Sequence, residues 1–83
     1  MKIVVRRDDP LSFDVVKFVY QNGFDDCFDI IVETESPALL QSLGVDTIPL
    51  LVDNEGVVTE LAKIKTFNEI VAAIDKVYLG YEH

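Results

Sequence analysis

The segment of residues 2–32 constrains the fold most, because two short apolar runs lie on either side of an amphipathic helical pattern. The first run, KIVV at residues 2–5, is rich in β-branched residues and is typical of a buried strand. Asp9 followed by Pro10 predicts a helix start, with Asp as the N-cap and Pro at the first helical position. The run FDIIV at residues 28–32 predicts a second strand. A strand–helix–strand unit of this kind crosses over right-handed and pairs its strands in parallel.

The remainder of the chain repeats these signals and adds a hairpin. Serine and proline at residues 36–37 again place a cap before a proline, and predict a helix that ends at Gly44. The runs IPLLV (residues 48–52) and VVTEL (residues 57–61) predict two strands, and the polar turn DNEG between them favours antiparallel pairing. The Thr-x-x-Glu pattern that begins at Thr66 matches a capping box and opens the clearest helical pattern in the chain.

The predicted order β-α-β-α-β-β-α gives an α/β fold in which a four-stranded mixed sheet carries three helices. No internal repeat or linker interrupts the sequence, so we expect residues 1–83 to form a single domain. Apolar residues make up 49% of the 83 residues, which is enough for one small core without disulfides or metal.

The charge of the chain limits its partners. Fifteen acidic residues against seven basic ones give a net charge of −8. This balance opposes direct binding to nucleic acid or to an anionic membrane, because phosphates would be repelled. The acids are spread along the chain, which favours a role in solubility. Docking to a basic partner, as a blocker of a nucleic-acid-binding protein, is the alternative.

Two further features bear on location. The sequence has no long apolar run for a membrane helix, and its start lacks the apolar stretch of a signal peptide. The single cysteine cannot form an internal disulfide. We therefore expect the protein in the cytoplasm, or in a host cytoplasm if the gene is viral.

The element order, the first turn Asp9-Pro10-Leu11-Ser12 and the step Thr47-Ile48-Pro49 together resemble the thioredoxin-like superfamily, glutaredoxins most of all. The resemblance runs from Lys2 to about Leu79. It implies a thioredoxin/glutaredoxin-like domain in which the peptide bond before Pro49 is cis and lies beside the first turn.

The departures from that family bear on chemistry. Glutaredoxins carry Cys-Pro-x-Cys at the first turn, where this chain keeps the proline and has Asp9 and Ser12 in place of both cysteines. A carboxylate cannot form a mixed disulfide, so the resemblance implies a redox-inactive protein. The family's Gly-Gly-Asp segment, which holds glutathione, is replaced by TELAKIK, and this argues against glutathione binding in the family's manner.

Cys27 is the thiol on which an alternative hypothesis depends. Three aspartates flank it in the segment FDDCFD, and nearby negative charge disfavours the thiolate. We therefore expect a structural or partly buried cysteine. The alternative is a glutaredoxin-like thiol oxidoreductase that works through Cys27.

The resemblance also implies a recognition surface around the first turn and the proline step. Its predicted members are Arg7, Asp9, Pro10, Ser12, Thr47, Ile48 and Pro49. A helix cap is the alternative role for Asp9 and Pro10. Ser12 is expected to be exposed in the first helical turn, and the only histidine that could activate it is His83 at the chain end, so no hydrolase is expected.

A second candidate site lies at the same edge of the predicted sheet. Arg6 and Arg7 follow the first strand, Lys63 and Lys65 follow the fourth, and a helix N-terminus lies beside them. Helix N-termini favour anions, so this edge is a candidate site for a carboxylate or phosphate. Neutralisation by the acids Asp8, Asp9 and Asp46 is the alternative. The sequence has no Cys/His cluster and no glycine-rich phosphate loop, so we expect neither metal nor cofactor.

These observations favour a non-catalytic adaptor or inhibitor that binds a protein partner. The sequence gives no identity for that partner. In this fold the strand that begins at the proline can offer backbone groups to an extended peptide.

Overall fold

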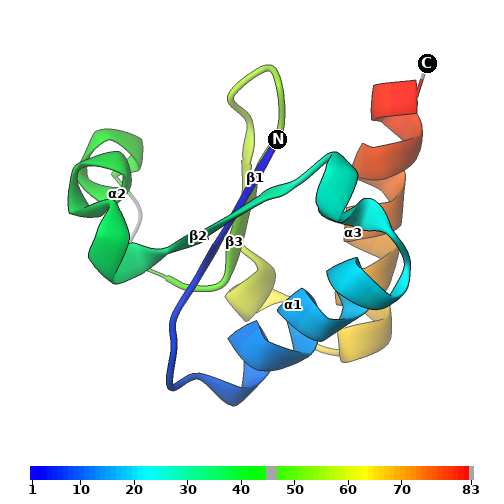
Figure 1. Cartoon of the computed structure of the whole chain (residues 1–83), viewed down its shortest axis with the longest axis horizontal. Helices are drawn as coiled ribbons and strands as arrows, with labels where there is room; N and C mark the ends of the chain where they lie inside the picture. Colours follow the sequence, from blue (N-terminus) through cyan, green and yellow to red (C-terminus); the bar gives the residue numbers. More distant parts are fainter. Residues whose placement is uncertain (45–46, 83) are drawn as a thin grey trace.

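The computed structural model describes residues 1–44 and 47–82. Within these residues the chain forms four strands and three α-helices in the predicted order (Figure 1). The strands are β1 (Lys2–Val5), β2 (Asp29–Val32), β3 (Leu50–Val52) and β4 (Val58–Thr59). The helices are α1 (Pro10–Gln21), α2 (Pro37–Leu43) and α3 (Phe67–Glu82), and the 3₁₀ turns are η1 (Phe24–Asp26), η2 (Glu33–Glu35) and η3 (Leu61–Lys63). None of the described helices is long and apolar enough to cross a membrane.

The strands form one mixed sheet in the order β2-β1-β3-β4. β1 pairs with β2 in parallel, and the other two pairings are antiparallel. The C-terminal ends of β1, β2 and β4 and the N-terminal end of β3 therefore lie at the same end of the sheet. We call it the turn end, because the Asp9–Ser12 turn follows β1 there. The opposite end, where the β3–β4 turn lies, is the hairpin end.

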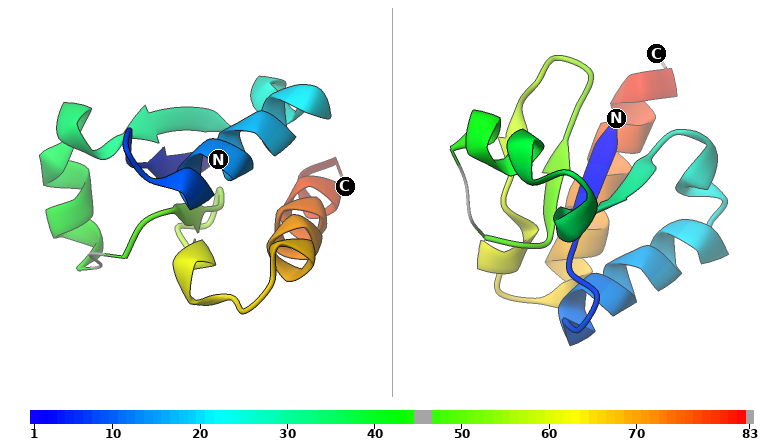
Figure 2. Two further views of the ribbon diagram at one scale, coloured as in Figure 1. Left: turned by 90° about the horizontal axis from the view of Figure 1, so that it is seen from below. Right: turned by 60° about the vertical axis from the view of Figure 1, so that its left-hand side comes forward.

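Helices cover both faces of the sheet. α1 and α3 lie on one face and the short α2 lies on the other (Figures 1 and 2). Because side chains alternate along a strand, Ile3 and Val5 of β1 join the core under α1 and α3, while Val4 joins the core under α2. The larger core also contains Val15 and Val19 of α1 and Ile70 and Ile74 of α3. Phe28 before β2, Leu51 of β3 and Leu61 of η3 complete it.

Local capping explains where two of the helices begin. Asp9 has extended backbone angles, and its carboxylate accepts a hydrogen bond from the Ser12 N–H, as an N-cap does. The Thr66 hydroxyl accepts a hydrogen bond from the Glu69 N–H at 3.2 Å. This is one of the two hydrogen bonds of the predicted capping box. Ser36 makes no side-chain capping bond, so α2 begins at Pro37 without one.

The strands are shorter than predicted. The third covers Leu50–Val52 instead of residues 48–52, and the fourth only Val58–Thr59 instead of residues 57–61. The cause lies at the turn end, where the Pro49 carbonyl accepts from the Ala62 N–H of η3 at 3.2 Å. Proline has no N–H for a strand ladder, so pairing begins one residue later.

Candidate functional site

The turn end of the sheet brings together the segments of the predicted recognition surface. Val4 pairs with Leu50, so the residues after β1 and the residues before β3 leave the sheet together. The pairing of Leu51 with Thr59 brings the residues after β4 to the same edge. The parallel pairing of β1 with β2 adds η2.

A closed set of hydrogen bonds holds the first turn. One Asp9 carboxylate oxygen accepts from the Ser12 N–H at 3.0 Å and from the Ser12 hydroxyl at 2.8 Å. The same hydroxyl accepts from the Arg6 N–H at 3.1 Å. Ser12 thereby joins the end of β1 to the start of α1.

The prediction that Ser12 is exposed is wrong, because its exposed fraction is only 1%. Its hydroxyl is used fully inside the protein, as both donor and acceptor. A buried hydroxyl without partners would be costly, and the Asp9 carboxylate and the Arg6 N–H supply them.

The segment before β3 lies at the same end. The peptide bond between Ile48 and Pro49 is cis, the isomer expected for it from the sequence. Both side chains are buried, and Ile48 packs in the core under α2. The Thr47 hydroxyl donates to the Glu60 carboxylate at 2.8 Å. Ile48 and Pro49 therefore present no side chains to a partner, and the Pro49 carbonyl already accepts from the Ala62 N–H.

Glu60, which the sequence analysis did not identify, holds the segment before β3 in place through its hydrogen bond with Thr47. Its second carboxylate oxygen lies 3.2 Å from the Lys63 ammonium. The hydrogen bond from Thr47 and then the one from Lys63 lower the pKa of Glu60. The predicted antiparallel hairpin could have indicated this contact, because it places residue 60, just after β4, beside the start of β3.

The two arginines are paired with acids of η2. The Arg6 guanidinium lies 2.6 Å from the Glu33 carboxylate and also donates through a second nitrogen at 3.2 Å. This hydrogen bond, followed by the charge of Glu33, raises the pKa of Arg6. Arg7 contacts Glu35 at 3.5 Å. The parallel β1–β2 pairing could have predicted these partners, since it places residues 33–35 beside residues 6–7.

The predicted anion site therefore carries its own counter-charges. Arg6, Arg7 and Lys63 each face a carboxylate, and an added anion would compete with these pairs. Lys65 is exposed and makes no ion pair with any described residue. Of the acids named as neutralising partners, Asp9 contributes to the charge around Arg6 and Asp46 lies outside the described residues.

Exposed side chains surround the Asp9–Ser12 turn, which we call the closed turn because its polar side chains hydrogen-bond each other. Pro10 is exposed at the start of α1, and the Arg7 side chain is 72% exposed despite its contact with Glu35. Phe13, in the first turn of α1, is 65% exposed. Sequence reasoning did not identify Phe13, although it falls off the apolar face of the helical pattern. An apolar ring and a cation therefore lie next to the turn.

Cys27 lies at the other end of the sheet. It follows η1 and precedes β2, whose first residue Asp29 pairs with Lys2 at the hairpin end. The cysteine is half-buried and packs against the core under α1 and α3. The whole length of β1 and β2 thus separates the thiol from the Asp9–Ser12 turn.

The chemistry open to the turn end follows from these contacts. It carries no thiol, and the Ser12 hydroxyl is buried and hydrogen-bonded. His83 lies outside the described residues. No group of three or more Cys, His, Asp or Glu side chains among the described residues could hold a metal ion.

Comparison of the chain with family models, with curated proteins and with solved structures gave no match in any of the three.

Proposed function

We propose that this chain is a redox-inactive, thioredoxin-like adaptor or inhibitor that binds a protein partner through the turn end of its sheet. The β-α-β-α-β-β-α order and the mixed four-stranded sheet are those that the resemblance implies, and they support the assignment. The Asp9–Ser12 turn and the segment before β3 leave the sheet at one end, which supports a shared surface.

The observation that carries the proposal is the closed turn itself. Where a glutaredoxin has two cysteines, a carboxylate and a hydroxyl hydrogen-bond each other at 2.8 Å and the hydroxyl also binds the end of β1. These groups stabilise the turn and leave no reactive atom there. The exposed Pro10, Phe13 and Arg7 around the turn suit recognition, since aromatic and arginine side chains are enriched where proteins bind each other.

Backbone groups next to the turn provide a second element of recognition. Within the described residues, no hydrogen bond involves the backbone of Ile48. An extended peptide lying along this segment would pair with Ile48 as an added strand does. The partner would then contact Phe13 and Arg7 with its side chains.

A pair of photo-crosslinking variants tests the proposal. p-Benzoylphenylalanine replaces Phe13 in one variant and Tyr20 in the other, both exposed aromatic residues of α1, 65% and 57% exposed. We expect the Phe13 variant to capture a defined protein in lysate of the source cell, and the Tyr20 variant not to capture it. Capture should be unchanged by dithiothreitol and by Cys27→Ser, because no mixed disulfide is involved.

Three outcomes would overturn the proposal. The first is no capture from position 13, and the second is the same set of proteins from both positions. The third is a partner that is lost in Cys27→Ser or under reducing conditions, which would favour the thiol oxidoreductase.

A further inference from the structure

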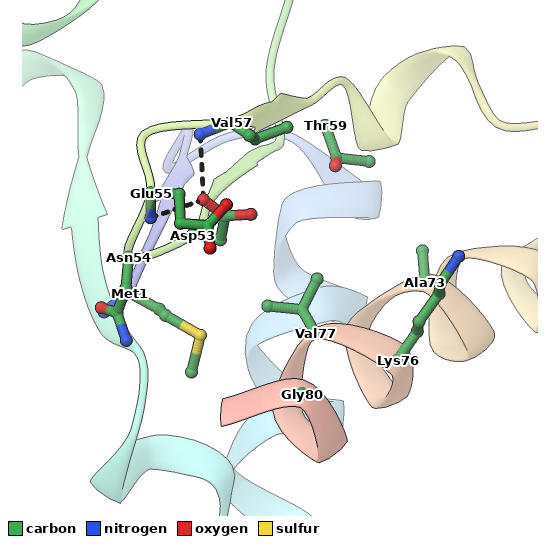
Figure 3. A pocket seen from close by; sticks show the side chains of 10 residues that line it. All are labelled: Met1, Asp53, Asn54, Glu55, Val57, Thr59, Ala73, Lys76, Val77 and Gly80. Carbon is green, nitrogen blue, oxygen red and sulfur yellow. Dashed lines mark hydrogen bonds between the residues drawn. The ribbon is translucent and has the colours of Figure 1, made fainter. Parts of the chain in front are cut away.

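A pocket of about 770 Å³ lies at the hairpin end of the sheet, away from the proposed recognition surface (Figure 3). Its size falls within the range of small-molecule sites, roughly 300–1,000 Å³. The β3–β4 hairpin forms one side and the C-terminal half of α3 forms the other. The side chain of Met1 extends between them.

The floor of this pocket is apolar. Ala73 and Val77 of α3 are half-buried there, and Val57 of the hairpin, although apolar, is 55% exposed. A ligand that covers Val57 and Met1 would remove apolar surface from water, which favours binding. The apolar lining therefore favours a ligand with an apolar body.

Gly80 keeps one side of the pocket open. It lies in the last turn of α3, where glycine is among the least favourable residues for a helix. A Cβ at this position would meet no atom within 4 Å, so packing does not require a glycine. Because Gly80 lines the pocket, a larger side chain at residue 80 would take up space at its rim.

The charge of the hairpin side is negative. One Asp53 carboxylate oxygen accepts from the N–H groups of Glu55 and Val57, both at 2.9 Å, so the hairpin holds this carboxylate in place (Figure 3). The exposed Glu55 adds a second carboxylate. On the far side, Lys76 makes no ion pair with either acid. The Met1 ammonium donates to the Asn54 side chain at 3.2 Å.

We propose that this pocket binds a small organic amine. The apolar body of the amine lies on Met1, Val57 and Val77, and its ammonium group faces the carboxylates of Asp53 and Glu55. The net charge of −8 adds a general attraction for cations and a general repulsion of anions.

A matched pair of probes tests the charge preference. 4-Phenylbutylamine and 5-phenylpentanoate share the same apolar body and differ in the sign of their charge. In titrations followed by amide chemical shifts, we expect the amine to move the signals of Glu55, Val57, Ala73 and Val77. The carboxylate should leave them in place at the same concentration.

Three variants locate the site. Glu55→Gln should weaken amine binding about two- to fivefold, the range expected for an exposed charge pair. Glu69→Gln, at another exposed acid, in the first turn of α3, should leave it unchanged. Gly80→Leu should abolish the shifts in a folded protein, because residue 80 lines the pocket and has open space for a larger side chain.

Several results would overturn the proposal. Equal shifts with the amine and the carboxylate would show an apolar hollow without charge selection. The proposal also fails if the amine moves none of the four signals, or if Gly80→Leu in a folded protein leaves the shifts intact. Because the pocket and the turn end lie at opposite ends of the sheet, these outcomes leave the proposed partner surface untouched.

Discussion

Ser12 connects the first strand to the first helix through a hydroxyl that both donates and accepts. Its donor bond goes to the helix cap Asp9 and its acceptor bond comes from the Arg6 N–H. With an exposed fraction of 1%, water cannot replace either partner. Ser12 is therefore a structural element of the turn.

Ser12→Ala should lower the free energy of unfolding by about 1–3 kcal/mol, because it removes a buried hydroxyl and leaves the part-buried Arg6 N–H without its acceptor. Ser42→Ala is the matched control, since the exposed Ser42 hydroxyl only donates to the Leu39 carbonyl. The control should change stability by less than about 0.5 kcal/mol. Urea unfolding measures both variants, and equal losses would show that the buried hydroxyl has no special role.

The sequence predicted part of this arrangement. The capping role of Asp9 follows from Asp-Pro alone, because a cap is a local feature of the chain. The burial of Ser12 does not follow, since it depends on how the end of β1 folds back over the start of α1. The Glu33 and Glu60 contacts could have been inferred from the predicted strand pairing, which brings these distant residues to the same end of the sheet.

At the scale of elements, the ends of α2 and α3 contain glycines with different backbone requirements. Gly44 ends α2 in the left-handed region at φ 68°. Gly80 lies within α3, where no positive φ is needed and the space for a Cβ is open.

The same substitution should therefore have opposite effects at the two sites. Gly44→Ala should destabilise the protein by about 1–2 kcal/mol, the cost of a side chain in the left-handed region. Gly80→Ala should stabilise it by about 0.5–1 kcal/mol, because alanine favours the helix more than glycine does. Thermal and urea unfolding of both variants check the signs. A loss of stability in Gly80→Ala would show that this glycine has a packing role after all.

Element order and type were predictable because each helix begins with a recognisable cap or proline and each strand is a short apolar run. The 3₁₀ turns η1, η2 and η3 were not predicted, since three residues are too few to show a periodicity. The strand ends were overestimated where the Pro49 carbonyl bonds to η3 instead of to a strand.

At the scale of the whole molecule, the sheet separates two kinds of surface. The turn end carries paired charges, the exposed Phe13 and Ile48, whose backbone makes no hydrogen bond to any described residue. The hairpin end carries Cys27 and a pocket with two carboxylates on its hairpin side and Lys76 on the side of α3. The blocker of a nucleic-acid-binding protein remains a prediction from the charge, and its mark would be binding that weakens steeply as salt rises.

The central proposal is that the first turn keeps the geometry of a redox turn without its sulfur. The side chains of Asp9 and Ser12 already meet at 2.8 Å, so cysteines at these positions should meet as well. The direct measurement is the number of free thiols after mild oxidation of the variant Asp9→Cys/Ser12→Cys in a Cys27→Ser background. The pair Asp9→Cys/Phe13→Cys is the control, because the Phe13 side chain is exposed while that of Ser12 is buried.

We predict that both thiols of the first variant disappear into an intramolecular disulfide, that the control keeps its thiols, and that the wild-type chain does not turn over in a thiol–disulfide exchange assay. Free thiols in a folded Asp9→Cys/Ser12→Cys variant, or turnover by the wild-type chain that Cys27→Ser abolishes, would contradict the proposal.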